Sequence, residues 1–207
     1  MVRLFVTRLP ALLILVCSCL ELRADVIDWL YDVEVPVATQ SVSDTRAAAA
    51  RAFSTVLTRV TGLKAIPRNP LLAGALRNPE RFYARYRFVR KESGVKNIVD
   101  HEMVFEVSFD PRAVQDLVRS AALPIWSANR PRILAWIVLE EGSSNVVASD
   151  DTSPWVRTIR ARSRDRGLLV QLPLMDLEDH ERISGSTIFG GFSEQILRAS
   201  ERYIAQY

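Results

Sequence analysis

Two hydrophobic patterns open the chain, and each predicts a different element. Apolar side chains occupy alternate positions from Trp29 to Val37, with Asp32 and Glu34 between them, which predicts a strand with one buried face. A helical stripe follows, and Gly62 lies just beyond its last turn as a helix-ending residue. The stripe consists of Ala50, Phe53, Leu57 and Val60, and the candidate N-caps before it are Ser41, Ser43 and Asp44.

Two Asn-Pro pairs, Asn69-Pro70 and Asn78-Pro79, each predict a helix start, because asparagine caps a first turn and proline fits its first position. The expected elements are a helix at 70–77, one turn from Pro79, strands at about 86–91 and 97–109, and a helix capped by Asp110. The first five elements of this β-α-α-β-β-α order resemble polypeptide-transport-associated domains in topology alone.

The second half of the chain has a different pattern. Ile133–Leu139 is a continuous apolar run of strand length, which predicts a strand buried on both faces in a parallel sheet. The elements expected after it are a hairpin within 140–153, a helix from Pro154 to Gly167, a strand at 168–174 and a helix from about Phe192. The order β-α-β-α predicts parallel pairing with right-handed crossovers.

The fold class predicted from these elements is therefore α/β, in two domains. Residues 25–126 form an α+β domain, residues 130–207 form a small parallel α/β domain, and the hinge lies near Ser127–Arg130. We expect the second domain to be truncated at its C-terminal end, because the β-α-β-α pattern should close with a further strand beyond Tyr207.

Residues 1–24 have the order of a secretory signal peptide. Arg3 and Arg8 precede the apolar segment Leu9–Leu20, and we expect cleavage before Asp25, giving a periplasmic protein. The apolar segment is shorter than the roughly 20 residues that a membrane span needs. An alternative is lipidation of Cys19, which lies in a partial lipobox; the product would be a membrane-tethered lipoprotein.

Composition excludes several kinds of chemistry. Both cysteines, Cys17 and Cys19, lie in the signal, so the mature chain has no disulfide, thiol nucleophile or cysteine metal ligand. The formal net charge of +3 would fall to about +1 after removal of residues 1–24. A charge this small does not indicate nucleic-acid binding.

The acidic segment Asp176, Glu178, Asp179 and His180 is the candidate ligand site. It follows the predicted strand 168–174, at the strand end where open α/β sheets bind ligands, and its side chains could hold a divalent cation. We expect the loops 140–153 and 176–185 to converge there, so that Glu140, Glu141, Asp150 and Asp151 join the rim. The alternative is a solvated loop in which Asp176 or Asp179 caps a helix.

Other polar features are interpreted as structural. The stretch Gly185–Phe192 lacks the lysine of a phosphate loop, and its two adjacent glycines predict a turn into the last helix. The arginines between Arg157 and Arg166 surround their helix, which predicts a solvated surface. Trp126 and Trp136 are expected to pack in the core at the domain junction. No catalytic residue or cofactor is predicted.

A series of short motifs resembles one bacterial family of exported proteins, catalogued as domain of unknown function 2066. These motifs are Val35-Pro36-Val37, Val60-Thr61-Gly62, Asn69-Pro70, Phe109-Asp110, Leu123-Pro124 with Trp126, Arg130-Pro131 with Trp136, Leu172 to Asp179, Gly190-Gly191-Phe192, and Ala199-Ser200 with Arg202-Tyr203. The resemblance implies export, and it implies no activity, substrate or catalytic residue.

The function expected from these observations is a non-catalytic partner-binding or assembly module of the periplasm, whose partner is another envelope protein. A membrane would be contacted only through a lipid anchor at Cys19. The alternative is a ligand- or metal-binding protein, or a hydrolase, that uses the acidic segment after the second parallel strand.

Overall fold

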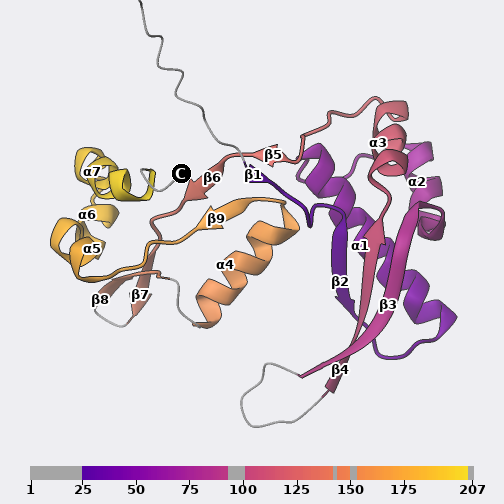
Figure 1. Ribbon diagram of the computed structural model, residues 1–207, viewed down its shortest axis with the longest axis horizontal. Helices are drawn as coiled ribbons and strands as arrows, with labels where there is room; N and C mark the ends of the chain where they lie inside the picture. The colour runs from indigo at the N-terminus through magenta and orange to yellow at the C-terminus, as the bar shows by residue number, and fades with distance from the viewer. Residues whose placement is uncertain (1–24, 93–100, 142–143, 150–152, 205–207) are drawn as a thin grey trace, which may run out of the picture.

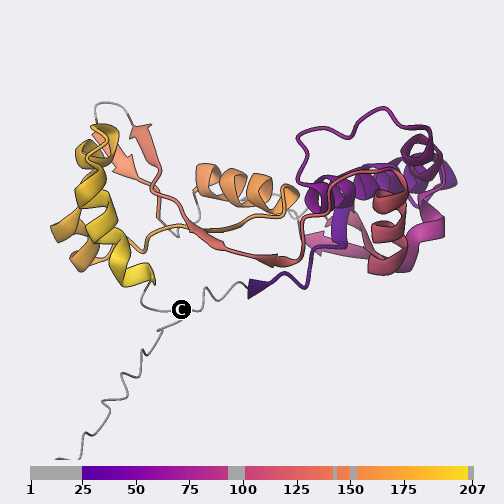
Figure 2. The same ribbon diagram turned by 90° about the horizontal axis from the view of Figure 1, so that it is seen from above.

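The computed structural model describes residues 25–92, 101–141, 144–149 and 153–204. It is an α/β structure with a lobe of sheet and helices at one end and a group of short helices at the other (Figure 1). A middle section that contains α4 (Pro154–Asp165) connects the two, as the view from above shows (Figure 2). The predicted signal peptide with Cys19, and the predicted rim residues Asp150 and Asp151, lie outside the described residues.

The sheet lobe is built on three antiparallel strands in the order β2-β4-β3. Both β2 (Asp32–Pro36) and β3 (Tyr83–Glu92) pair with β4 (His101–Phe109). Alternation along β2 buries Val33 and Val35 and leaves Glu34 exposed, so the predicted half-buried strand is confirmed in a shorter form. It is shorter because residues 28–31 form a turn in which the amide of Asp32 donates to the carbonyl of Trp29.

Helix α1 (Val42–Thr61) covers one face of this sheet (Figure 1). The side chain of Ser41 accepts from the amide of Asp44 at 3.2 Å, as expected of an N-cap. At the other end Gly62 has a φ of 70°, and its amide donates to the carbonyl of Thr58. A left-handed residue of this kind ends helices readily when it is glycine, because it has no Cβ to clash. Both predicted ends of the helix are confirmed.

Three further helical segments start where the sequence predicts. In α2 (Pro70–Arg77) the side chain of Asn69 accepts from the amide of Leu71 at 2.8 Å. The second Asn-Pro pair begins the 3-10 turn η1 (Pro79–Phe82). Asp110 caps α3 (Pro111–Ser120) by accepting from two amides of its first turn. These starts are local signals, which explains why they can be predicted without the rest of the fold.

The core of the sheet lobe lies between α1 and the sheet. Phe53 of α1 is fully buried, with its ring centroid 4.8 Å from that of Phe82 and 5.0 Å from that of Phe109. These rings bring η1 and the end of β4 onto the helix. Truncation of such a phenylalanine to alanine costs about 3–5 kcal/mol, so this cluster contributes a large part of the stability of the lobe.

The apolar run Ile133–Leu139 does not form the single buried strand that we predicted. Its first part is β6 (Arg132–Leu134), which pairs in parallel with β9 (Leu169–Gln171). Its last part belongs to β7 (Val138–Glu141), which pairs antiparallel with β8 (Ser144–Val147). The parallel ladder is only three residues long, so the chain leaves it and bends into a hairpin, and Ile133 is 41% exposed. The predicted parallel pairing across α4 is confirmed; the predicted strand 168–174 is shorter than expected.

The distal lobe consists of the hairpin and three short helices, α5 (Leu177–Arg182), α6 (Gly185–Phe189) and α7 (Ser193–Ile204). A small buried cluster of Ala148, Val156 and Leu172 lies where α4 and the strands meet it. Trp136 belongs to this lobe: its Nε1 donates to Ser200 Oγ at 2.9 Å, and its ring meets that of Tyr203 edge to face. The prediction that placed Trp136 at the domain junction is therefore wrong.

Between the lobes, the C-terminal ends of α1 and α4 meet around buried arginines. The guanidinium of Arg130 donates to the carbonyls of Arg59, at 2.6 Å, and Gly167, and lies 3.8 Å from the ring centroid of Trp126. The last carbonyls of a helix lack partners and carry partial negative charge, so a cation placed between two such ends offsets both. Beside them β1 (Asp25–Val26) pairs with β5 (Asn129–Arg130).

The same junction corrects the prediction for the arginines of α4. Arg166 donates to the carbonyl of Leu63 at 2.9 Å, and the guanidinium of Arg164 lies 4.4 Å from the ring centroid of Trp29. These two arginines contact the sheet lobe and are not simply part of a solvated surface. The division into domains 25–126 and 130–207 stays a prediction, and Arg130, which we placed in the hinge, is buried in this junction. Among the described residues, no helix is both long and apolar enough to span a membrane.

Candidate functional site

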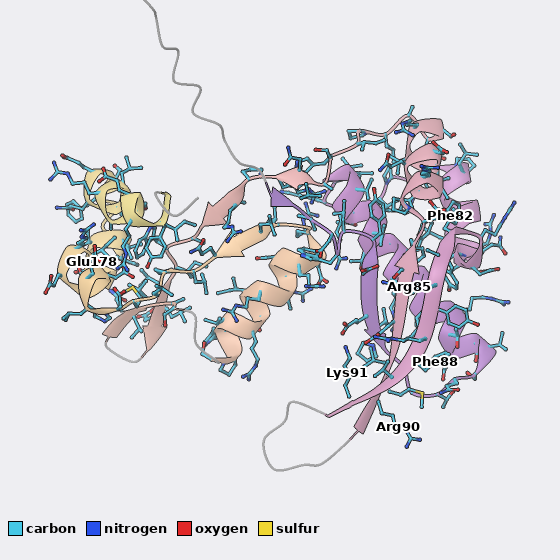
Figure 3. All side chains as sticks on the ribbon, viewed as in Figure 1. Phe82, Arg85, Phe88, Arg90, Lys91 and Glu178 are labelled. Atoms are coloured by element: carbon cyan, nitrogen blue, oxygen red, sulfur yellow. The ribbon has the colours of Figure 1, made fainter. Side chains whose placement is uncertain are left out.

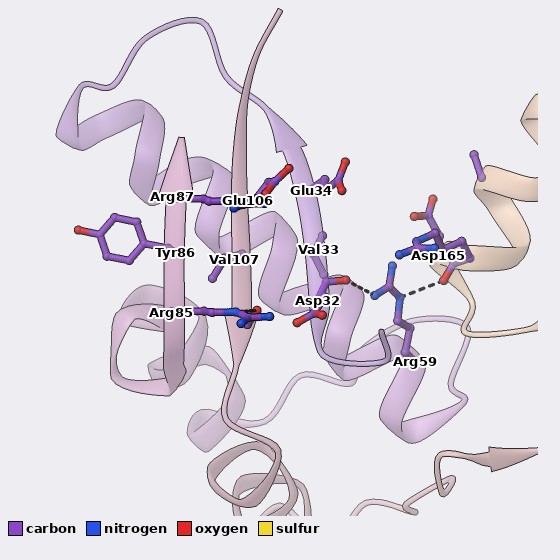
Figure 4. Close-up of a pocket in the computed structure, with 13 residues that line it drawn as sticks. Asp32, Val33, Glu34, Arg59, Arg85, Tyr86, Arg87, Glu106, Val107 and Asp165 are labelled. Atoms are coloured by element: carbon purple, nitrogen blue, oxygen red, sulfur yellow. Dashed lines mark hydrogen bonds and ion pairs between the residues drawn. The ribbon is translucent and has the colours of Figure 1, made fainter. Parts of the chain in front are cut away.

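A pocket of about 810 Å³ lies between the outer face of the sheet, opposite α1, and the last turns of α4 (Figure 4). A volume of this order falls in the range of small-molecule sites. Thirteen residues line it: Asp32, Val33, Glu34, Arg59, Arg85, Tyr86, Arg87, Glu106, Val107, Ser108, Ala161, Arg164 and Asp165. Strand alternation places most of the charged side chains, because every second residue of β2, β3 and β4 points away from α1.

At one end of the pocket the charges already have partners. Arg87 Nε lies 2.6 Å from a carboxylate oxygen of Glu106, and Lys91 bridges Glu106 and Glu34. Hydrogen bonds from Lys91 and Arg87 hold the pKa of Glu106 below its usual value, and the bond to Glu34 raises the pKa of Lys91. The side chains of Arg87, Lys91 and Glu34 are exposed and only that of Glu106 is partly buried, so the pairs stabilise the fold little, and their effect is to neutralise this part of the pocket.

At the other end Arg59 enters the pocket from the last turn of α1. Only 2% of this residue is exposed, and its Nη1 and Nε donate to the carbonyls of Asp32, at 2.8 Å, and Arg164, at 2.9 Å. Burial lowers the pKa of Arg59 to about 10, so the guanidinium remains charged at neutral pH. Among the described residues no carboxylate lies within ion-pair distance of it, and backbone carbonyls provide its hydrogen bonds.

The described residues that line this pocket include no histidine, cysteine or lysine. Ser108 has the one aliphatic hydroxyl among them, and Ser108 Oγ accepts a hydrogen bond from Arg85 Nε at 3.0 Å. A serine nucleophile needs an adjacent base that can take its proton, and a guanidinium cannot do so.

A second hollow, a groove of about 830 Å³, runs along the free side of β3, next to the first turns of α1. Its apolar surface comes from Val42, Tyr83, Tyr86 and Phe88, and Arg46 and Arg85 lie among them. The ring of Tyr86 is supported by Phe105, with 5.8 Å between centroids, while 58% of the residue is exposed. The groove therefore combines an ordered aromatic surface with access from solvent. Sequence reasoning missed it, because the two sides come from residues about 40 positions apart.

The acidic segment predicted as a ligand site is hydrogen-bonded to α7. Asp176 caps α5, and Arg202 binds its carboxylate with two hydrogen bonds of 2.7 and 2.8 Å. Asp179 is fully buried and accepts from Arg202, from the amide of Met175 and from the hydroxyl of Tyr203. Of the two remaining residues, Glu178 lies 3.5 Å from Arg202 and His180 contacts the carbonyl of Asp176 through Nδ1.

The pKa values of Asp176, Arg202 and Tyr203 in this network are shifted from their ordinary values. The two hydrogen bonds from Arg202 hold the pKa of Asp176 well below its usual range, and the same bonds raise the pKa of Arg202. Burial, together with the bond to Asp179, raises the pKa of Tyr203 to about 12. The second interpretation from sequence, in which Asp176 caps a helix, is confirmed by its bond from the amide of Asp179 at 3.1 Å.

Within the described ranges no group of three or more carboxylate, histidine or cysteine side chains could hold a metal ion. The structure brings Asp176 and Asp179 together, as expected, and places a guanidinium between them. The glycines after α6 form the predicted turn: Gly190 caps that helix and Gly191 has a φ of 68°.

Comparison with known proteins gives one family. Its model, described as Domain of unknown function (DUF8605), matches residues 24–127, just over half of the chain and nearly all of the sheet lobe. No curated protein and no solved structure matches significantly. The expectation of an uncharacterised domain is thus confirmed, under a different family from the one that the motifs resemble. The chain belongs to the DUF8605 family.

Proposed function

We propose that the protein is a non-catalytic partner-binding module of the bacterial cell envelope, with another envelope protein as its partner. The observation that carries this proposal is the free side of β3. Within the part of the chain that the structure describes, β3 pairs with β4 alone, and the groove beside it exposes 58% of Tyr86 and 75% of Val42. An open strand edge next to exposed apolar side chains is a ready surface for another chain.

The other polar features give less support to an enzyme. The charged pocket lacks a nucleophile with a base, and the acidic segment is engaged by Arg202 and Tyr203. A hydrolase or a metal-binding protein that used Asp176 and Asp179 would first have to break this network. Partner binding needs no such change.

The envelope location rests on the sequence. The order of residues 1–24 is that of an export signal, and the resemblance to the exported family catalogued as domain of unknown function 2066 supports the same location. A lipid anchor at Cys19 would tether the module to a membrane, and cleavage before Asp25 would release it to the periplasm. The partner would be an envelope protein in either case.

Site-specific photo-crosslinking in living bacteria tests the proposal. A photoreactive amino acid at Tyr86 or Val42 should give one crosslinked species that fractionates with the envelope. The matched control is Leu71, which is 51% exposed on α2, outside the groove. We expect no such species from Leu71. The same crosslinked species from Leu71, or no crosslinked species from Tyr86 and Val42, would contradict partner binding at this edge.

A further inference from the structure

We propose that β3 receives an extended segment of the partner as an added strand, and that this segment alternates acidic and apolar residues. This inference rests on the proposed function and names its mode and the chemistry of the partner. Three observations carry it: the free edge of β3, the position of the groove, and the distribution of cations along the strand.

The edge itself supplies backbone partners. β3 runs for ten residues from Tyr83 to Glu92 and is paired with β4 on one side. On the other side the described residues contain no strand partner, so one set of its amide and carbonyl groups faces the groove or solvent. Peptides that add to sheets bind by pairing with such groups, and a neighbouring groove then selects alternate side chains.

The groove lies where those alternate side chains would enter. One wall is the start of α1, with Val42 and Thr45, and the other is β3 itself, with Tyr86 and Phe88. Tyr86 lies within ring contact of Tyr83, at 5.6 Å, and Phe105. Side chains of a strand point to opposite faces in turn, so every second residue of an added strand would face these rings. Apolar residues are expected at those positions.

The remaining positions would face the outer surface of the sheet, on which Arg85, Arg87 and Lys91 alternate with Tyr86 and Phe88. Arg87 and Lys91 are already paired with Glu106 and Glu34, so Arg85 is the cation of this face that an added strand could pair with. Figure 3 shows Arg85, Arg90 and Lys91 spread along β3. Arg85 has no carboxylate partner among the described residues, nor has Arg90 or, across the groove, Arg46. Glu80 is the one acidic residue among the residues that line the groove. Opposite charges directly across two strands are favourable, which selects aspartate or glutamate.

The same charges argue against a second copy of this chain as the occupant. Pairing β3 with β3 of another copy would bring Arg85 and Arg90 of both copies, which have no carboxylate partner among the described residues, onto two adjacent strands. Like charges opposite each other across strands are destabilising. A different chain with acidic side chains has no such penalty, so the proposal commits to a heterologous partner.

A peptide pair tests the inference on the purified protein. The probe is a ten-residue peptide in which valine and glutamate alternate, and its control replaces each glutamate with lysine. Fluorescence anisotropy should show binding of the glutamate peptide and at least about ten-fold weaker binding of the lysine peptide. Two further versions of the probe are methylated on alternate backbone amides, one on the odd-numbered and one on the even-numbered residues. One of the two should not bind, because its methylated amides are those that pair with β3.

Two protein variants connect the binding to this edge. Tyr86→Ala should weaken binding of the glutamate peptide by about ten-fold, since exposed aromatic anchors often dominate binding. Arg85→Glu should reduce the preference for glutamate over lysine. Leu71→Ala, which removes an exposed apolar side chain elsewhere, should leave the affinity unchanged. All three positions are exposed, and circular dichroism will show that each variant is folded.

Several results would overturn strand addition. The first is that the glutamate peptide does not bind, and the second is that the lysine peptide binds equally well. The third is that the affinity of the glutamate peptide does not change on methylation of its backbone amides or on the Tyr86→Ala substitution. Specific crosslinks from Tyr86 together with any of these results would leave the proposed function standing and remove only the inferred mode. A dimer in light scattering that Tyr86→Ala dissolves would assign the edge to a second copy and overturn the proposal as well.

Discussion

The Nε of Arg59 donates to the carbonyl oxygen of Arg164 at 2.9 Å, which joins two residues 105 positions apart. Through this bond the last turn of α1 is fixed to the last turn of α4, and the charged pocket is closed at one end. Arg130 extends the same contact by donating to Arg59 and Gly167. The junction of the two halves of the molecule is therefore a polar one, in which arginines satisfy helix-end carbonyls.

Truncation of Arg130 to alanine should be strongly destabilising. It would leave the carbonyls of Arg59 and Gly167 without their donor in a buried position, at a cost of about 1–3 kcal/mol each. Urea denaturation should show a loss of at least about 2 kcal/mol. Arg112→Ala, on the exposed side of α3, should change stability by less than about 0.5 kcal/mol. Similar losses at the two positions would mean that Arg130 has no special role.

Two glycines should respond in opposite directions to alanine. Gly167 has a φ of 67°, and a Cβ there would lie 2.3 Å from Nη1 of Arg130. Gly167→Ala should therefore destabilise by about 1–3 kcal/mol and displace the guanidinium. Gly74 lies inside α2 with open space around it, so Gly74→Ala should stabilise by roughly 0.5–1 kcal/mol. Urea midpoints of both variants measure the contrast, and a stable Gly167→Ala would count against the junction as described.

Acid should weaken the contact between α5 and α7. The pKa of Asp176 is lowered in the folded protein by Arg202, whereas the unfolded chain has the ordinary value near 3.8. Such a carboxylate stabilises the fold above its unfolded pKa, and the stabilisation is lost as the pH falls below about 4. Unfolding free energies measured between pH 6 and pH 2.5 should thus decline more steeply for the wild type than for Asp176→Asn.

Asparagine at 176 can still cap α5, so this variant removes the charge and keeps the bond from the amide of Asp179. Arg202→Gln should show the same shallow pH dependence, since it removes the partner. Curves parallel to that of the wild type would show that the pair is not coupled to folding.

Divalent cations should leave the melting temperature unchanged. Arg202 already occupies the space between Asp176 and Asp179, and the described residues offer no cluster of three metal-ligating side chains. Thermal melting with millimolar Ca²⁺, Mg²⁺, Mn²⁺ or Zn²⁺ tests this. A rise in the melting temperature of the wild type that is absent from an Asp176→Asn, Asp179→Asn double variant would support a metal site at this segment, because a ligand that binds only the folded state stabilises it.

The sequence predicts the elements whose signals are local. Ser41, Asn69 and Asp110 cap the helices that they were expected to cap, because each cap needs only the next two or three amides. The run Ile133–Leu139 was misassigned, since its hydrophobicity cannot tell how long the partner strand is. Arg59 and Arg130 were missed as junction residues because their acceptors are carbonyls of distant helix ends, which any residue type provides. The cap at Asp176 was among the interpretations from sequence, but the partners Arg202 and Tyr203 lie 23 to 26 positions away, and their approach depends on how α7 packs.

The bond between Arg59 and Arg164 also sets an order of events during synthesis. Chains emerge from the N-terminus, and domains tend to fold as they emerge. When the sheet lobe has been synthesised, α4 has not yet been made, so the carbonyl of Arg164 that accepts from Arg59 Nε does not exist, and neither does the carbonyl of Gly167 that accepts from Arg130. In a nascent chain stopped after Ser120, Nη1 of Arg59 could already donate to the carbonyl of Asp32, while its Nε would still lack the carbonyl of Arg164. The polar junction at the end of α1 can therefore be completed only after residues 164–167 have been synthesised, whereas the buried core of the sheet lobe is made of residues that precede them.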